Sequence, residues 1–155
     1  MTAPNLELKI PPVLVAVIFI VLMWLLDLLL PGIATSNLFR LGAYVVLMAV
    51  GGFFSVAGVV AFKMANTTVN PITPAVSSVL VTSGIYKSTR NPMYLGFLFF
   101  LFGFGLFLSN LYSLALCAGF VLYMNRFQIQ PEEKALESAF GAEFLAYKER
   151  VRRWL

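Results

Sequence analysis

The stretch TSGIYKSTRNPMYLG, residues 82–96, is a polar island with two cations and several hydroxyls in a chain that is otherwise mostly apolar. An uncharged run from Met93 to Asn125 follows directly. Asn91-Pro92 marks a boundary, because proline disfavours the helical conformation at the residue before it and suits the first turn of the helix that it opens. A helix start presents unpaired N–H groups and partial positive charge. The backbone around Met93 and Tyr94 is therefore a candidate site for a carboxylate or hydroxyl groups.

A second interpretation of this stretch is structural. Residue types alone favour an interfacial loop that caps a membrane helix, with Arg90 and Tyr94 as headgroup anchors. The connection of which it is part, residues 65–90, is rich in Thr, Asn and Pro and is longer than a membrane hairpin needs. Long ordered loops are more often functional than decorative, which favours a site here.

Composition places the chain in a membrane class. Of its 155 residues, 60% are hydrophobic and 12% are charged, which is unlike a soluble domain of this length. One cysteine, Cys117, and no histidine exclude an internal disulfide and argue against zinc sites and histidine relays, so we expect no metal. The net charge of +4 comes from basic residues that flank apolar segments rather than form one stripe. We therefore expect the lipid bilayer as a partner, and no nucleic acid.

Four apolar segments read as membrane helices. The uncharged run would be roughly 50 Å long as one helix, well beyond a hydrocarbon core of about 30 Å, so we expect a hairpin. Ser109-Asn110 lies near its middle and is the natural break. In an earlier segment, Gly51, Gly52 and Gly58 allow close approach of a neighbouring helix. The predicted membrane helices are Pro11–Leu30, Leu41–Phe62, Pro92–Leu108 and Leu111–Arg126.

Lysine and arginine are distributed asymmetrically about these segments. All but Arg40 fall on one side of a chain with four crossings, which predicts that both termini and the long loop face the cytoplasm. The expected fold is all-α and polytopic, with a cytoplasmic amphipathic helix at the C-terminal end. We expect one domain, residues 1–155, in which 11–62 holds two spans and 63–155 holds the loop, the helical hairpin and the C-terminal helix.

The segment Pro131–Leu155 has the pattern of that amphipathic helix. Apolar residues recur at steps of three and four, and Pro131 followed by two glutamates suits a helix N-terminus and its dipole. A helical wheel nevertheless places Glu132 and Glu133 on the flanks of the apolar stripe, where carboxylates need a partner. A cationic or polyhydroxyl ligand would supply one. A solvated or headgroup-facing surface is the expectation for the basic cluster Lys148, Arg150, Arg152 and Arg153.

Four ordered blocks resemble the isoprenylcysteine carboxyl methyltransferase family and the related phospholipid N-methyltransferases. The blocks are KMANTTVNP at 63–71, LVTSGIY at 80–86, RNPMYLG at 90–96, and the Glu132-Glu133 pair followed by 140–154. The likeness covers about two-thirds of the chain, Phe62 to Leu155, and four blocks in order are much more specific than any one. The likeness is to the small bacterial branch, so the resemblance implies a bacterial inner membrane.

The resemblance implies an integral membrane enzyme that uses S-adenosyl-L-methionine in a cytoplasm-facing pocket. Asn91 stands where eukaryotic members have histidine, so no imidazole chemistry carries over. Gln128-Ile129-Gln130 stands where relatives tend to have a basic residue. Arg90 and Arg126 are the candidate substrate contacts, and no catalytic residue is assigned. Carried over by position, the cofactor-binding residues are Ser78, Val79, Leu80, Val81, Tyr86, Asn91, Pro92, Met93, Tyr94, Glu132 and Glu133.

The expected reaction is methyl transfer to a lipophilic small molecule or lipid. A carboxylate acceptor needs no proton removal, whereas an amine or a thiol must lose a proton, and a chain without histidine offers few bases. This favours carboxyl methylation or a pre-ionised thiolate. A phospholipid-amine N-methyltransferase and a thiol S-methyltransferase are the alternatives. From another class, a non-catalytic small membrane protein explains the composition equally well, though not the four blocks.

Overall fold

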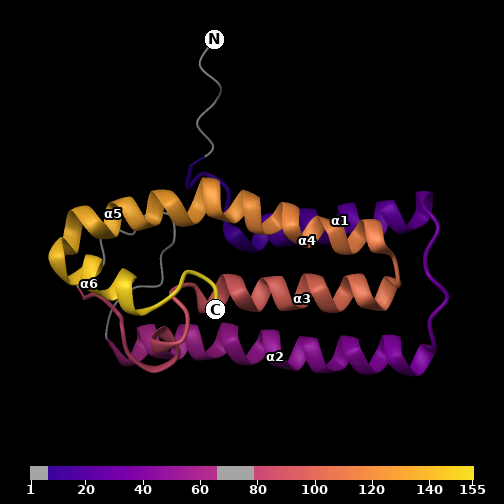
Figure 1. Ribbon diagram of the computed structural model, residues 1–155, viewed down its shortest axis with the longest axis horizontal. Helices are drawn as coiled ribbons and strands as arrows, with labels where there is room; N and C mark the ends of the chain where they lie inside the picture. The colour runs from indigo at the N-terminus through magenta and orange to yellow at the C-terminus, as the bar shows by residue number, and fades with distance from the viewer. Residues whose placement is uncertain (1–6, 66–78) are drawn as a thin grey trace, which may run out of the picture.

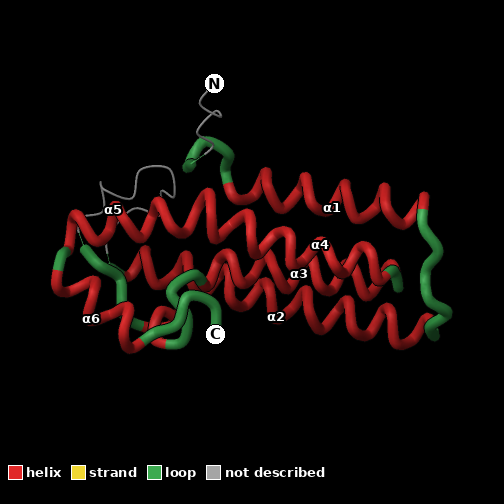
Figure 2. Tube along the Cα trace, turned by 45° about the horizontal axis from the view of Figure 1, so that its top comes forward, coloured by secondary structure: helices red, strands yellow, loops and turns green. Residues whose placement is uncertain are grey.

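The computed structural model describes residues 7–65 and 79–155, which form helices joined by loops and contain no β-strand. Figure 1 and Figure 2 show the long helices side by side in a bundle, with the shorter C-terminal helices at one end of it. The predicted all-helical class is confirmed for these residues. The elements in order are α1 (Pro12–Leu29), α2 (Asn37–Met64), η2 (Gly84–Lys87), α3 (Pro92–Leu108), α4 (Leu111–Met124), η3 (Asn125–Ile129), α5 (Gln130–Phe140) and α6 (Ala142–Arg150).

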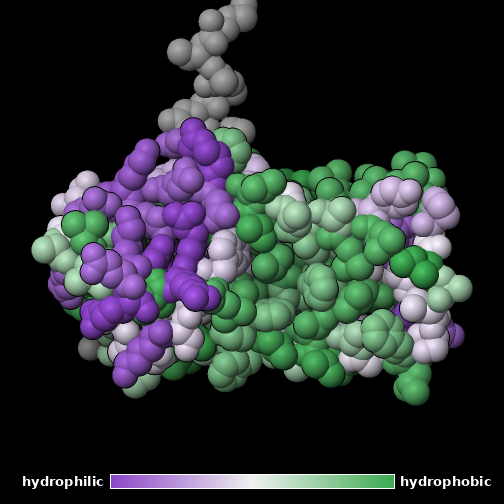
Figure 3. Space-filling view, viewed as in Figure 1, coloured by the Kyte–Doolittle hydropathy of each residue, from purple (hydrophilic) through white to green (hydrophobic). Residues whose placement is uncertain are grey.

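The surface of the bundle is apolar. Helices α1 and α2 are long and apolar enough to cross a membrane, and large hydrophobic side chains are exposed along both. Figure 3 shows hydrophobic residues over the bundle and hydrophilic residues over the end that carries α5 and α6. Soluble proteins rarely expose apolar surface on this scale. The chain is therefore a membrane protein, and α3, with 17 residues, is a shorter apolar helix of the same bundle.

Helix boundaries follow local capping. Helix α3 has the predicted bounds, and α1 agrees within one residue at each end. The predicted start of the second helix at Leu41 is wrong, because Ser36 caps it: its Oγ accepts a hydrogen bond of 3.2 Å from the backbone N–H of Phe39. An accepting Ser side chain satisfies one of the unpaired N–H groups at a helix start, so the helix begins at Asn37.

Helices α2 and α3 form the most extensive contact in the bundle, and small residues permit it. A Cβ at Gly96 would overlap Ser55 Oγ and lie 2.6 Å from the carbonyl oxygen of Gly51. A Cβ at Gly51 would lie 2.5 Å from the ring of Phe100. The predicted close approach is confirmed for Gly51 and Gly58, and is wrong for Gly52, around which there is open space. This packing fixes the start of α3 against the bundle.

A buried asparagine organises the opposite end. Ser109 adopts a left-handed conformation that ends α3, as the predicted break requires. Asn110 caps α4 by accepting hydrogen bonds from the N–H groups of Tyr112 and Ser113, at 3.0 and 3.2 Å. Its Nδ2 donates to the carbonyl of Leu30 at 3.1 Å, which ties the hairpin to α1. The hairpin is thus held in register by hydrogen bonds shielded from solvent and lipid.

The prediction of one amphipathic helix over Pro131–Leu155 is wrong. Gly141 has a positive φ of 50°, which ends α5 and starts α6 in a new direction. Helix α6 ends at Arg150, and residues 151–155 continue as a non-helical C-terminal segment. The carbonyls of this segment bind side chains and backbone of residues 89–91 instead of continuing a helix. The result is a second core, in which Phe144, Tyr147 and Val151 pack with Val81 and Tyr86.

Candidate functional site

A tyrosine and a glutamate from different helices meet at the polar end of the bundle. Tyr94 lies in the first turn of α3 and is buried, and Glu132 lies in the first turn of α5. The Tyr94 hydroxyl donates a hydrogen bond of 2.5 Å to Glu132 Oε1. Helix α4 continues into α5 through the π-helical turn η3. Such turns are frequent at functional sites, and they change the direction in which the following side chains point.

Glu132 has an unusual electrostatic environment. Burial raises the pKa of its carboxyl to about 8; the hydrogen bond from Tyr94 lowers it, and the neighbouring charge of Glu133 raises it. Within residues 7–65 and 79–155, no cation lies within ion-pair distance of this carboxylate. A desolvated carboxylate without a cation favours either a proton or a positively charged ligand.

Glu133 is, by contrast, fully paired. Arg90 Nη2 lies 2.7 Å from Oε1, and Arg153 Nη2 lies 2.6 Å from Oε2. Burial alone would raise the pKa of the Glu133 carboxyl, but the hydrogen bonds and charges of Arg153 and Arg90 lower it below its ordinary value. The two adjacent glutamates therefore differ: Glu133 is ionised and held between two arginines, whereas Glu132 has no cationic partner among the described residues.

The C-terminal segment closes over the start of α3. Arg90 donates from Nη1 to the carbonyls of Val151 and Lys148, at 2.6 and 3.0 Å, and its backbone N–H donates to Arg152. Asn91 Nδ2 donates to the carbonyl of Arg153 at 2.9 Å. These bonds hold residues 89–91 and the C-terminal segment as one unit. The buried Nε of Arg90 has no hydrogen-bond partner among the described residues.

Several predicted residues fall in the second core, beside this unit. Val81 and Tyr86 are buried there, and Leu80 packs against them. The Tyr147 hydroxyl donates to the carbonyl of Tyr86 at 2.7 Å, and the Tyr86 ring contacts Phe62 at the end of α2. Burial raises the pKa of the Tyr86 phenol far above its ordinary value, so it stays protonated at any physiological pH.

The remaining predicted residues are distributed more widely. Pro92 and Met93 pack beside Gly58 of α2, and this contact holds the start of α3 against α2. Val79 is exposed, and Ser78 lies outside the described residues. Arg126 is exposed and pairs with Glu7 at 2.6 Å, so the structure does not bring it to Glu132 or Glu133.

Sequence reasoning missed the role of Arg153. The basic cluster near the C-terminus was expected to be solvated, and that expectation is wrong for Arg153, which binds Glu133. Asn125 was also missed: its Oδ1 accepts from Trp154 Nε1 at 3.1 Å and from Arg153 at 3.5 Å. The available signal was weak, because only the tertiary fold brings the C-terminal segment to α5. No group of three metal-ligating side chains occurs among the residues that the structure describes.

The arrangement fits one kind of ligand chemically. Glu132 offers a partly buried carboxyl to a cation or to hydroxyls, and the Tyr94 hydroxyl donates to one of its oxygens. S-adenosyl-L-methionine carries an ammonium, a sulfonium, a carboxylate and two ribose hydroxyls. The carboxyl of Glu132 is chemically compatible with the cationic or hydroxyl groups of this cofactor.

Comparisons with known proteins point the same way. Residues 39–143 match the family model described as phospholipid methyltransferase. An uncharacterized protein of Haemophilus influenzae is 46% identical over 63 residues, which are 41% of this chain and all of that protein. The protein-S-isoprenylcysteine O-methyltransferase of Saccharomyces cerevisiae is 40% identical over 47% of this chain, and that of Xenopus laevis is 38% identical over 48%. The aligned segments span only 30% and 26% of those two enzymes. No solved structure matches the chain.

Proposed function

The chain belongs to the phospholipid methyltransferase family, and on that premise we propose that it is an S-adenosyl-L-methionine-dependent methyltransferase that acts on a lipophilic acceptor at the membrane. Two observations support the proposal: the family match, and the Tyr94–Glu132 pair at the polar end of the bundle. When bound, S-adenosyl-L-methionine supplies a sulfonium methyl that is already activated for in-line displacement. The protein's task is then to bind, orient and exclude water.

The single observation that carries the cofactor assignment is the carboxyl of Glu132 without a cation. In the free protein its pKa of about 8 keeps most of it protonated at neutral pH. A cation placed against it favours the ionised form, so binding displaces the proton. Tyr94 orients the carboxylate through its hydroxyl, and Arg90 and Glu133 hold the loop and the C-terminal segment around it.

The supporting residues have assigned roles in this proposal. Val81 and Tyr86 form an apolar and aromatic wall beside the start of α3, and Leu80 packs against it. Asn91 ties that start to the C-terminal segment. A dry, rigid wall is what an in-line displacement needs, because the nucleophile must be held close and aligned. The acceptor enters from the bilayer, which surrounds the apolar face of the bundle.

Four membrane crossings with both termini in the cytoplasm, in a bacterial inner membrane, are part of the proposal. Helices α3 and α4 are short for full crossings, and tilt or local thinning of the bilayer accommodates such helices. The hairpin then returns the chain to the side on which α2 ends, where Lys63 lies in the last turn. The basic residues gather on that side, as the charge rule for cytoplasmic loops requires.

Transfer of a labelled methyl group tests the function directly. Purified protein in detergent is incubated with methyl-labelled S-adenosyl-L-methionine and a lipid extract, and label is counted in the organic phase. We expect label to enter that phase with the parent protein and to be lost with Glu132→Gln. Lys134→Gln is the matched control, because Lys134 is an exposed residue of the same helix. No label in any lipid fraction would contradict a lipophilic acceptor.

A second candidate is transfer to an amine or a thiol, and the pKa of Glu132 favours it. The ionised fraction of a carboxyl with a pKa of about 8 is a stronger base than an ordinary glutamate, and that fraction grows as the pH rises toward 8. In that case Glu132 takes the proton from the acceptor instead of facing the cofactor. The two roles separate experimentally: a base role lowers kcat in Glu132→Gln and leaves cofactor affinity unchanged, whereas a binding role lowers cofactor affinity.

A further inference from the structure

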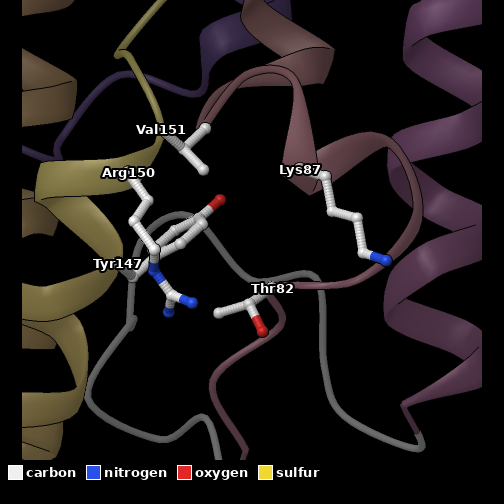
Figure 4. A pocket seen from close by; sticks show the side chains of 5 residues that line it. All are labelled: Thr82, Lys87, Tyr147, Arg150 and Val151. Atoms are coloured by element: carbon white, nitrogen blue, oxygen red, sulfur yellow. The ribbon is translucent and has the colours of Figure 1, made fainter.

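A pocket of about 330 Å³ lies beside the second core and is lined by Thr82, Lys87, Tyr147, Arg150 and Val151 (Figure 4). Its lining residues do not include the Tyr94–Glu132 pair, nor the cluster of Arg90, Glu133 and Arg153. Tyr147 and Val151 are buried in the second core, whereas Lys87 and Arg150 have no role in the proposed function.

The pocket carries two positive charges, and the described part of the chain places no carboxylate against them. Neither Lys87 nor Arg150 forms an ion pair with a carboxylate within residues 7–65 and 79–155, and no carboxylate lines the pocket there. Among the residues that the structure describes, the Arg150 side chain donates from Nε to the carbonyl of Ala146, 3.2 Å away, and its two terminal nitrogens form no hydrogen bond. Figure 4 shows the Arg150 guanidinium next to the methyl group of Thr82, whose hydroxyl is turned away from it, and the Lys87 ammonium on the other side of Thr82.

This donor set suits a phosphate group. A guanidinium, an ammonium and a hydroxyl offer several charge-assisted hydrogen bonds to phosphate oxygens, and arginine binds such oxygens in pairs. The pocket volume of about 330 Å³ is at the lower end of small-molecule sites, roughly 300–1,000 Å³. It therefore has room for a phosphate together with a small polar substituent such as glycerol.

The position of the pocket matches the level of lipid phosphates. Helix η2, which contributes Lys87, packs on the end of α2 through the contact between Tyr86 and Phe62. Lys63 lies in the last turn of α2, where the apolar helix ends. The polar headgroup region begins where the hydrocarbon core ends, so a lipid phosphate can reach this point.

We propose that Thr82, Lys87 and Arg150 form a binding site for a phosphate group at the membrane boundary, separate from the Tyr94–Glu132 pair. An anionic lipid headgroup and free phosphate share this chemistry. Bound there, the phosphate links η2 to α6, two elements that flank the second core. The site does not depend on methyl transfer, and it exists whether or not the proposed function holds.

Calorimetry tests the proposal with three probes: dihexanoyl phosphatidylglycerol, dihexanoyl phosphatidylcholine and inorganic phosphate. The protein is the full chain in a neutral maltoside detergent. We expect the anionic lipid to bind, and the double variant Lys87→Gln/Arg150→Gln to lose about tenfold or more in affinity, since two charge-assisted contacts are removed. The matched control, Lys134→Gln/Arg152→Gln, removes two exposed charges outside the pocket and should stay within about twofold of the parent.

A second variant guards against unfolding. Thr82→Val keeps the shape and every charge, and should weaken binding severalfold through the lost hydroxyl alone. Binding of inorganic phosphate that is as tight as that of the lipid would identify free phosphate as the occupant, and preference for the lipid would identify the headgroup. If the parent binds none of the probes, or if the double variant and Thr82→Val both bind like the parent, the proposed site does not exist.

Discussion

The hydroxyl of Tyr94 donates a 2.5 Å hydrogen bond to the carboxylate of Glu132, which joins the first turn of α3 to the first turn of α5. The two residues are 38 positions apart in the sequence, one before and one after the hairpin of α3 and α4, which brings them to the same end of the bundle. Their contact places a carboxyl that lacks a cation beside the loop and the C-terminal segment. The predictions about the site depend on this relationship.

Tyr94→Phe isolates the hydroxyl. The hydrogen bond from Tyr94 lowers the pKa of Glu132, so its removal should raise that pKa further above 8. Cofactor binding should then require a higher pH, while the aromatic ring keeps the helix packing intact. The measurement is the affinity for S-adenosyl-L-methionine across the pH range. An unchanged pH midpoint in a folded variant would show that Tyr94 does not act on Glu132.

Glu133→Gln should destabilise the protein rather than change its chemistry. The carboxylate binds both Arg90 and Arg153, and each hydrogen bond to a charged group contributes about 1.5–3 kcal/mol. Because the pKa of Glu133 is lowered on folding, its stabilisation is present above the unfolded pKa and is lost as pH falls. Thermal unfolding in detergent should therefore show a lower Tm at pH 7 and a weaker loss on acidification.

The control for that variant is Glu137→Gln. Glu137 is exposed and lies 3.5 Å from Lys148 in a surface ion pair, which contributes little to stability. A Tm for Glu133→Gln equal to that of Glu137→Gln would contradict the anchor role of Glu133.

Gly96→Ala should disrupt the contact between α2 and α3. The added methyl would overlap Ser55 Oγ and press on the carbonyl of Gly51, a backbone atom that cannot turn away. Overpacking of this kind costs about 1–3 kcal/mol or more. Gly52→Ala is the matched control, since open space surrounds that position in α2. The yield of monodisperse protein and its Tm measure the difference, and equal values for the two variants would refute the close packing.

Membrane topology can be mapped by cysteine labelling in a Cys117→Ala background. Ser109 and Asn110 are buried and are poor probes of the hairpin turn. Ala34 is exposed in the loop between α1 and α2, and Ser138 is exposed on α5. A membrane-impermeant maleimide applied to intact cells should label Ala34→Cys and spare Ser138→Cys. The reverse pattern would place the site outside the cytoplasm.

The sequence predicts the helices well because their causes are local. Pro92 opens α3 and Ser109-Asn110 ends it, and both signals are read from neighbouring residues. The start of α2 was also within reach, since Ser36 is a common helix cap. Gly141 was the available signal for the break between α5 and α6, but the apolar pattern continues through it. The apolar periodicity of residues 131–155 therefore predicted one helix, although the positive φ of Gly141 produces a turn there.

The site was only half predictable, for a physical reason. Both glutamates were expected to need partners, and the structure supplies different ones: Tyr94 for Glu132, and Arg90 with Arg153 for Glu133. Adjacent residues on a helix face different directions, so small changes of helix phase decide which partner each meets. The π-helical turn η3 sets the helix phase at Glu132 and Glu133, and no residue pattern predicted this turn. Arg153 reaches Glu133 only because α6 folds back.

Calorimetry of S-adenosyl-L-methionine binding at pH 6.5 and pH 8.5 tests the central claim, that Glu132 holds the cationic cofactor. The pKa of Glu132 in the free protein is about 8, so the parent should bind about tenfold or more tightly at the higher pH, where the carboxyl is ionised. Glu132→Gln should bind at least about tenfold more weakly at pH 8.5 and show little dependence on pH. A folded Glu132→Gln protein with the affinity and pH dependence of the parent would contradict the claim.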